Sequence, residues 1–272
     1  MTDKFFCLRV QGKSFRYFGS LVNCSVMIKK LNAFYRRQMF FPGWLGIFLN
    51  PFYFARSGLR DAMSEFAPKL SGRLLDVGCG SKPYQSMFAV DVYVGLDIDS
   101  EISRKRGIAD HHYDGHAFPF ADASFDSVLC NQVLEHVFNP DEFLGEIVRV
   151  LKPGGKLLLT VPFVWDEHEQ PYDYARYSSF GLRALLEKQG LKIDHHKKIG
   201  ADVSIIFQLA NAYLFKVTQG WSRPSKLLFT ASVMAIVNVM GLLASRMLPD
   251  NPDLFLDHIV LAEKASGIHM PI

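Results

Sequence analysis

A short apolar run that ends in a Gly-x-Gly turn constrains this chain more than any other feature. The run covers residues 73–77, the turn covers 78–80, and a second strand expected at 92–97 ends on Asp97, 21 residues after Asp76. This βαβ arrangement is typical of proteins that bind a nucleoside. Glycines let the backbone approach the ligand, and the carboxylate at the end of the second strand accepts hydrogen bonds from ribose hydroxyls.

The turn does not match the fingerprint of dinucleotide-binding proteins. Pro83 stands where the third glycine of that fingerprint falls, so no diphosphate needs to be cradled. The chain also lacks a Tyr-x-x-x-Lys pair. A nicotinamide-dependent sugar reductase or epimerase is therefore disfavoured.

Further segments continue the pattern in order along the chain. They are Asp114–Phe120, Ser124–Cys130, Asn131–Val137 and Leu151–Pro162. Together with the glycine turn, they resemble the motifs of class I S-adenosylmethionine-dependent methyltransferases. The resemblance covers 57–200 and 253–265. It implies a Rossmann-like α/β fold, a three-layer sandwich around a seven-stranded, mostly parallel sheet, with S-adenosylmethionine as the cofactor.

The resemblance also assigns roles to residues near the glycine turn. Gly78 and Gly80 pass under the methionine portion of the cofactor, although an ordinary tight turn could also use them. Asp76 compensates the ammonium of the ligand. Asp97 accepts from the ribose hydroxyls, and Asp99 is the nearby alternative.

Two more cofactor positions follow from the later motifs. Asp114 matches the position that accepts from the adenine amino group, with His116 beside it, and Asn131 lies beside the sulfonium. Glu135 and His136 follow the same strand, and we expect structural roles for both.

The acceptor is expected to bind after the fifth strand, since open α/β sheets bind ligands at the carboxyl ends of their strands. That loop, 164–177, is rich in groups that hydrogen-bond or take protons. His168 is the best general base, Asp173 orients it or binds sugar hydroxyls, and Arg176 holds an anionic group. The alternative is a structural latch that includes Asp173 and Arg176.

Strands and helices are expected to alternate between 57 and 199. A helix is expected from Ser57, another near Pro83, and a third after Asn139, whose capping box uses Glu142. The first fifty residues show no sustained helical period.

An apolar helical insertion at 201–252 departs from the minimal pattern of the family. It contains two apolar segments, 203–217 and 227–245. The second has no charge and approaches the length of a membrane span, whereas the first, of about fifteen residues, is too short to cross. The last strand must return to the same sheet, which argues against a single crossing. We expect a helical hairpin that packs on the domain, forms a homodimer seam or sits shallowly in a membrane.

The front of the chain is strongly basic. Residues 1–60 carry ten Lys or Arg against one acid, Asp3, while the whole chain has a net charge of +3. Aromatic residues lie among these cations, including Phe5, Phe6 and Phe15. This 1–56 extension favours an anionic membrane surface or a solvated face around core aromatics, with nucleic acid least favoured.

Cysteine usage indicates a reduced, cytoplasmic protein. The four cysteines show no C-x-x-C spacing, so neither disulfides nor a metal site is expected. Lys4 and Arg9 interrupt the only early apolar run, so no secretory signal is expected.

Taken together, these features lead us to expect a methyltransferase, peripheral on the cytoplasmic membrane face, that O-methylates a glycan, a lipid-linked saccharide or another small amphiphile. The alternative is an inactive nucleoside-binding protein anchored at a membrane.

Overall fold

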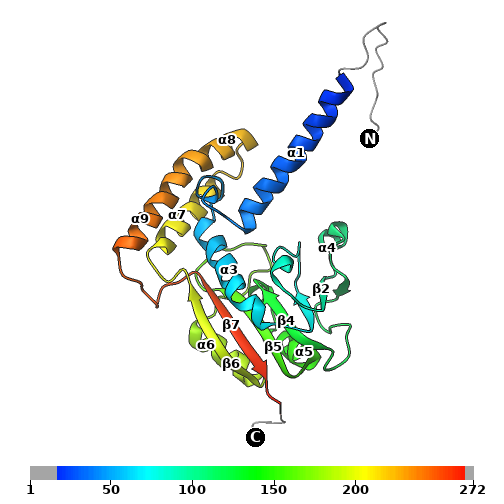
Figure 1. Cartoon of the computed structure of the whole chain (residues 1–272). Helices are drawn as coiled ribbons and strands as arrows, with labels where there is room; N and C mark the ends of the chain where they lie inside the picture. Colours follow the sequence, from blue (N-terminus) through cyan, green and yellow to red (C-terminus); the bar gives the residue numbers. More distant parts are fainter. Residues whose placement is uncertain (1–16, 267–272) are drawn as a thin grey trace.

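A seven-stranded sheet is the centre of the computed structural model, which describes residues 17–266 (Figure 1). The strand order is β3-β2-β1-β4-β5-β7-β6, and β7 runs in the opposite direction to the other six strands. The strands are β1 (Arg73–Val77), β2 (Val92–Ile98), β3 (His111–Tyr113), β4 (Phe125–Asn131), β5 (Leu151–Pro162), β6 (Leu191–Ile199) and β7 (Asp257–Lys264). The expected seven-stranded, mostly parallel sheet is confirmed.

Helices cover both faces of this sheet, because successive strand residues point to opposite sides. Leu75 and Leu157 pack on one side in the cluster that contains Phe143 and Leu186, whereas Leu74 packs on the other side beside Phe66. The first side is covered by α5 (Pro140–Val150) and α6 (Ser179–Lys188), and the second by α3 (Tyr53–Phe66). The result is the expected three-layer sandwich.

Two local predictions within the sheet domain are wrong. The segment after β1 contains only a 3₁₀ turn, η2 (Gln85–Met87), where a helix was expected near Pro83. Asn139 precedes α5 but makes no side-chain bond to a backbone N–H, so the capping box is absent. Its amide instead donates to the Glu142 carboxylate at 3.5 Å.

The remaining short elements of the domain are connectors. Helix α4 (Glu101–Arg106) is capped by Ser100, whose hydroxyl accepts from Ser103 N at 3.1 Å. The 3₁₀ turns η1 (Ala67–Lys69) and η3 (Leu134–His136) follow α3 and β4. The turn η3 places three residues of the Asn131–Val137 motif directly beyond the carboxyl end of β4.

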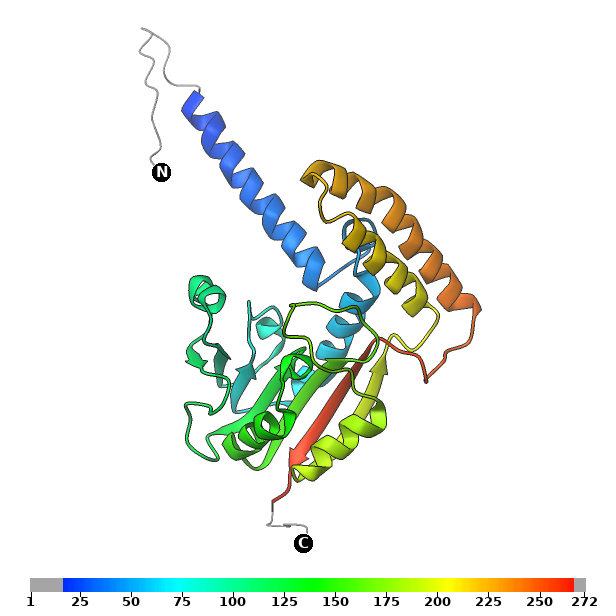
Figure 2. The ribbon, with the colours of Figure 1, turned by 180° about the vertical axis from the view of Figure 1, so that it is seen from behind.

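A long helix near the start of the chain escaped sequence analysis. Helix α1 (Tyr17–Phe40) projects away from the sheet (Figures 1 and 2). Its described side chains up to Arg37 are exposed, so no buried stripe imposes a period of 3.6 on the sequence. The basic and aromatic residues before Tyr17, including Phe5, Phe6 and Phe15, lie outside the described residues.

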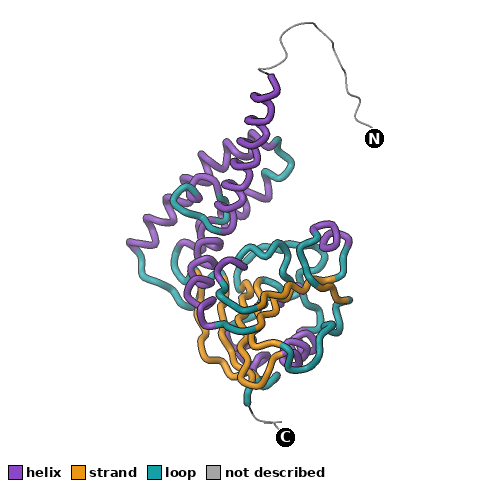
Figure 3. Tube along the Cα trace, turned by 45° about the vertical axis from the view of Figure 1, so that its right-hand side comes forward, coloured by secondary structure: helices purple, strands orange, loops and turns teal. Residues whose placement is uncertain are grey.

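Helices gather above the carboxyl ends of the parallel strands (Figures 1 and 3). Helix α7 (Ser204–Val217) packs against one continuous helix, Arg223–Met247. This 25-residue helix consists of α8 (Arg223–Phe229), a π-helical segment (η4, Thr230–Met234) and α9 (Ala235–Met247). We call 17–52, which includes α2 (Gly46–Leu49), together with 204–247 the cap.

Buried amides join the two parts of the cap. Gln208 donates to Pro51 O at 3.1 Å, and its amide oxygen accepts from the backbone N–H groups of Phe54 and Ala55 at the start of α3, at 3.0 and 3.1 Å. Asn238 donates to the carbonyl oxygens of Ile47 and Asn50 at 2.8 and 3.2 Å. Because a buried polar group without a partner is costly, these bonds fix how the N-terminal segment and the insertion fit together.

Candidate active site

The glycine turn after β1 is held against β2 by its backbone. Gly78 and Cys79 donate their N–H groups to Leu96 O at 2.8 and 3.0 Å. Gly78 has φ +68°, and a Cβ at this position would collide with the Val133 side chain. Any other residue at 78 would therefore push this turn away from the segment after β4. Gly80 also adopts a positive φ, +51°.

Asp76 is a buried carboxyl group that forms no ion pair within residues 17–266, although the charge of Lys82 acts on it. Asp76 is 4% exposed, and its Oδ2 accepts a hydrogen bond from Tyr93 Oη at 2.7 Å. Burial raises the pKa of Asp76 to about 7, and the Tyr93 hydrogen bond only partly opposes this. A cationic ligand at the turn would restore the ionised form, so Asp76 fits the ammonium group of the expected cofactor.

The structure distinguishes the two carboxylates that follow β2. Asp97 is half-buried, and it accepts from Ile98 N and from Ser103 Oγ, each at 2.9 Å. These bonds fix the carboxylate while its remaining lone pairs can still accept from ribose hydroxyls. Asp99 is exposed and forms an ion pair with Arg104, 2.6 Å from Nη2 to Oδ2. Asp97 is therefore the better ribose partner.

The other two expected cofactor residues lie on neighbouring strands. Asn131 ends β4 and accepts from Thr160 Oγ1 at 2.8 Å, which fixes its amide. Asp114 follows β3 and is exposed, and its Oδ1 accepts from His116 N at 3.0 Å. This backbone hydrogen bond lowers the pKa of Asp114. Since β3, β2, β1 and β4 are adjacent, the sheet brings all the expected cofactor residues to one edge.

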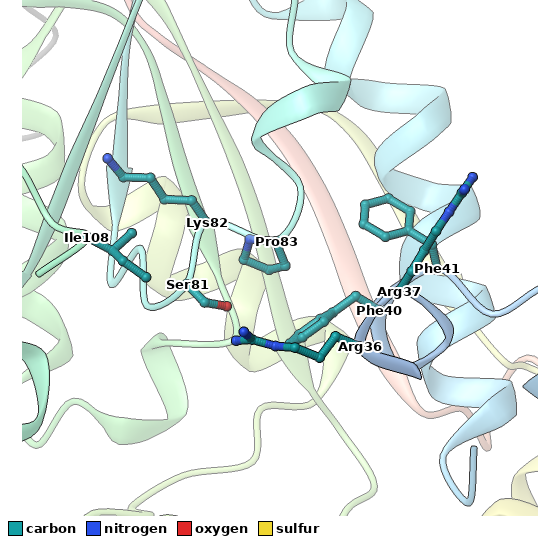
Figure 4. A pocket seen from close by; sticks show the side chains of 8 residues that line it. All are labelled: Arg36, Arg37, Phe40, Phe41, Ser81, Lys82, Pro83 and Ile108. Atoms are coloured by element: carbon teal, nitrogen blue, oxygen red, sulfur yellow. The ribbon is translucent and has the colours of Figure 1, made fainter. Parts of the chain in front are cut away.

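An open hollow of about 420 Å³ lies between the end of α1 and the glycine turn (Figure 4). It is lined by Arg36, Arg37, Phe40, Phe41, Ser81, Lys82, Pro83 and Ile108. Lys82 is paired with Asp110 at 2.6 Å, whereas both arginines are exposed. The hollow adjoins the turn but does not include Asp97 or Asn131. We therefore treat it as a neighbour of the cofactor site.

The loop after β5 is organised around one ion pair. Arg176 donates to both oxygens of Asp173, at 2.6 and 2.7 Å, and to Asp166 O at 3.1 Å. These bonds keep Asp173 ionised, because they outweigh burial and lower its pKa to about 2. With its two terminal nitrogens bonded within the loop, Arg176 matches the latch better than the anion-binding role.

His168 lies against this ion pair. Its backbone N–H donates to Asp173 Oδ2 at 3.0 Å, and its Nδ1 lies 3.3 Å from the same oxygen and 3.2 Å from Asp166 O. The side chain is 28% exposed. The Nε2 atom is left on the opposite side of the ring, where it can take a proton or bind a ligand.

Sequence analysis missed the importance of Glu135 beside this loop. Glu135 is fully buried, and neither carboxylate oxygen has a hydrogen-bond partner among the described residues. Burial raises its pKa to about 8. The rings of His136 and His168 lie close by, with ring centroids 4.8 Å apart. The adjacent Glu-His pair was the available signal, but the sequence did not show that a third group joins it across the loop.

Comparisons with known proteins identify the family of this chain. A family model described as "Methyltransferase domain" matches residues 75–159. The chain is 38% identical over 171 residues to an uncharacterized protein of Methanocaldococcus jannaschii. The alignment covers 59% of this chain and 81% of that protein. It is 30% identical over 143 residues to a probable S-adenosylmethionine-dependent methyltransferase of Mycolicibacterium smegmatis, covering 47% of this chain and 55% of that one.

One solved structure shows how far the architecture alone is shared. The [4+2]-cyclase SpnF superposes with a TM-score of 0.52 at 22% identity, over 77% of this chain and 81% of that chain. This likeness concerns the fold.

Together, the sheet order, the glycine turn and the sequence matches define a nucleoside-binding α/β protein. The chain belongs to the family of class I S-adenosylmethionine-dependent methyltransferases.

Proposed function

We propose that this protein transfers the methyl group of S-adenosylmethionine to an oxygen of an amphiphilic acceptor, a lipid-linked saccharide, at the cytoplasmic face of a membrane. The observation that carries the proposal is the position of the cap. The cap, with its exposed apolar and basic side chains, lies above the same sheet edge as the expected cofactor residues and the polar loop 164–177 (Figure 1). An acceptor with an apolar tail and a polar head would place its tail against the cap and its head against the polar loop.

The cofactor is expected to bind along the edge formed by β3, β2, β1 and β4. Asp97 would accept from the ribose hydroxyls, Asp76 would face the ammonium group, and Asp114 would accept from the adenine amino group. The backbone of 78–80 would lie beneath the methionine portion, with Asn131 beside the sulfonium. When bound, the cofactor supplies an activated methyl group.

The protein's task is then to align the acceptor hydroxyl and remove its proton. His168 is our choice for this step. Asp173 and the Asp166 carbonyl oxygen hold Nδ1, so Nε2 is the ring atom that can take the proton. Arg176 keeps Asp173 ionised and the loop closed.

The cap carries the surface that would meet the membrane. Large apolar side chains are exposed along the Arg223–Met247 helix, among them Leu228, Ile236, Met240, Leu243 and Met247. This is the one helix among residues 17–266 that is long and apolar enough to cross a membrane, and 28% of its apolar window is buried. Cations on α1, Lys29, Lys30, Arg36 and Arg37, can meet anionic headgroups at about 1 kcal/mol each.

Chain topology favours shallow insertion over crossing. The hairpin leaves the sheet after β6 and returns to it as β7, so both of its ends lie at the same sheet edge. Helix α7, with 14 residues, is about 21 Å long and too short to span the hydrocarbon core. The same surface could instead bind a second copy of the chain, which is the rival occupant.

A transfer assay tests the reaction. The protein is incubated with methyl-labelled S-adenosylmethionine and a bacterial membrane extract, and the label is followed into the organic phase. We expect label in that phase with the parent protein and little with Asp97→Ala. Label that stays entirely with water-soluble compounds would contradict the amphiphilic acceptor, and no transfer to any fraction would contradict the enzyme activity.

Liposome flotation tests the cap. The parent protein should float with anionic liposomes, weakly with neutral ones, and less at high salt. Leu228→Glu should reduce flotation, whereas Phe180→Glu, which changes an 84% exposed residue on α6, should not. A soluble dimer that binds neither kind of liposome would show that the cap is a dimer interface.

A further inference from the structure

Three side chains with metal-binding atoms converge between η3 and the loop after β5. Glu135 and His136 belong to η3, and His168 reaches them from the loop. One ligand atom from each lies within 4.8 Å of the other two. The Glu135 carboxylate oxygen Oε1 is 3.8 Å from His136 Nε2 and 4.0 Å from His168 Nε2.

Both imidazoles are held by the ring nitrogen that faces away from Glu135. His136 Nδ1 lies 2.7 Å from Tyr172 O, and His168 Nδ1 lies 3.2 Å from Asp166 O and 3.3 Å from Asp173 Oδ2. A ring whose Nδ1–H donates to a carbonyl or carboxylate oxygen presents an Nε2 lone pair. Such outer contacts are the usual way in which proteins orient metal-binding histidines.

The Glu135 carboxylate lacks the partner that its burial demands. It is 0% exposed, and both oxygens are unpartnered among the described residues. Separations of 3.8 and 4.0 Å are too long for hydrogen bonds to the histidines, and a buried carboxylate without a partner is costly. A cation between the three groups would remove this cost. The His136 and His168 side chains, 21% and 28% exposed, give such an ion a route from solvent.

We propose that Glu135, His136 and His168 bind a divalent first-row transition metal ion of the Zn²⁺ class. Two imidazole nitrogens and one carboxylate oxygen suit Zn²⁺, Fe²⁺, Co²⁺ or Mn²⁺ better than Mg²⁺, which prefers oxygen ligands. Bonds of about 2.1 Å place tetrahedral ligands about 3.4 Å apart. The histidine nitrogens, 3.8 and 4.0 Å from Glu135 Oε1, therefore need to approach it by about half an ångström, and the most distant pair of ligand atoms, within 4.8 Å, by up to about 1.4 Å. Three protein ligands leave a position open for an oxygen of the acceptor.

The site extends the proposed function and changes one role within it. His168 Nε2 cannot bind a metal and remove a proton together, so a bound ion would lower the pKa of the acceptor hydroxyl, and the hydroxyl proton would pass to solvent. The ion would also tie the loop to η3, where Tyr174 N already donates to Glu135 O at 2.8 Å. Metal binding is measurable without methyl donor or acceptor, so its failure is distinct from failure of the proposed reaction.

The test is a titration of the chelator-treated full-length protein with Zn²⁺ against a chromophoric chelator. We expect one tight site in the parent protein. Glu135→Gln should weaken Zn²⁺ binding by about a hundredfold or more, since it removes the anionic ligand while keeping its shape. Glu142→Gln is the matched control, because Glu142 is an exposed carboxylate 3.5 Å from a histidine, His116. It should leave the tight site unchanged.

Co²⁺ gives a second, spectroscopic readout. Its visible absorption should indicate nitrogen and oxygen ligation in the parent protein and change in His168→Ala, with circular dichroism confirming that both proteins are folded. Absence of a tight Zn²⁺ site in the parent would overturn the proposal. Equal affinity in the parent and Glu135→Gln would also overturn it, because surface histidines alone would then account for binding.

Discussion

Asp76 should couple cofactor binding to pH. It is buried, its hydrogen-bond donor is the neutral hydroxyl of Tyr93, and its pKa is raised to about 7. A ligand that presents an ammonium group should bind the ionised carboxylate. Below pH 7, binding must therefore release the proton of Asp76.

The size of this effect follows from the raised pKa. Affinity for S-adenosylhomocysteine, the demethylated product, should rise about tenfold for each pH unit between 5 and 7 and level off above pH 7. At pH 6, binding should release about one proton. Asp76→Asn should abolish the release and weaken binding at pH 8 by about tenfold to a hundredfold, the cost of one charge-assisted hydrogen bond.

The same group should affect the stability of the ligand-free protein. Because the folded-state pKa is raised, folding favours the protonated carboxyl. The stabilisation is complete below the ordinary pKa of 3.8 and is lost as pH rises through about 7. The difference between the folded pKa of about 7 and the ordinary pKa of 3.8 corresponds to about 4 kcal/mol in the free energy of unfolding. Asp76→Asn should remove this part of the pH dependence of unfolding.

Isothermal titration in two buffers with different ionisation enthalpies measures the proton release directly. Urea unfolding between pH 5 and pH 8 measures how the free energy of unfolding changes with pH. Equal heats in both buffers at pH 6, together with pH-independent affinity, would refute the placement of the ligand's ammonium beside Asp76.

Three further predictions concern separate parts of the molecule. Asp97→Ala should weaken S-adenosylhomocysteine binding about tenfold to a hundredfold by calorimetry, whereas Asp99→Ala should have little effect; equal losses would mean that the ribose partner is misassigned. His168→Ala should leave that affinity nearly unchanged and cut methyl transfer by about 10²–10⁴, and normal turnover would assign the role to another group. Asn238→Ala should lower the free energy of unfolding by about 1–3 kcal/mol in urea, because two buried carbonyl oxygens lose their donor; no loss would show that water replaces it.

The sheet was predictable, as was the meeting of the expected cofactor residues at one of its edges, because local sequence determines both. Strand-length apolar runs, a glycine turn and strand-end carboxylates each occupy a few consecutive residues. The structure adds what those residues touch. It shows that Asp99 forms an ion pair with Arg104, and that Gly78 has no room for a side chain beside Val133.

The rest depended on contacts between distant segments. The Glu135 site needs His168 from another loop, 33 positions along the chain, and no local spacing reveals that they meet. The cap relies on Asn238 bonding to the carbonyl oxygens of Ile47 and Asn50. Helix α1 lacked a detectable period because its described residues bury little, which removes the signal that sequence reasoning uses.

The most direct test of the account is identification of the methylated product. The protein is incubated with membrane extract and S-adenosylmethionine carrying a deuterated methyl group, and both the lipid and the aqueous fractions are examined by mass spectrometry. We expect the deuterated methyl group on an oxygen of a lipid-soluble, saccharide-containing species, and we expect Asp97→Ala to abolish this product. A product confined to the aqueous fraction, or one methylated on nitrogen or carbon, would contradict it.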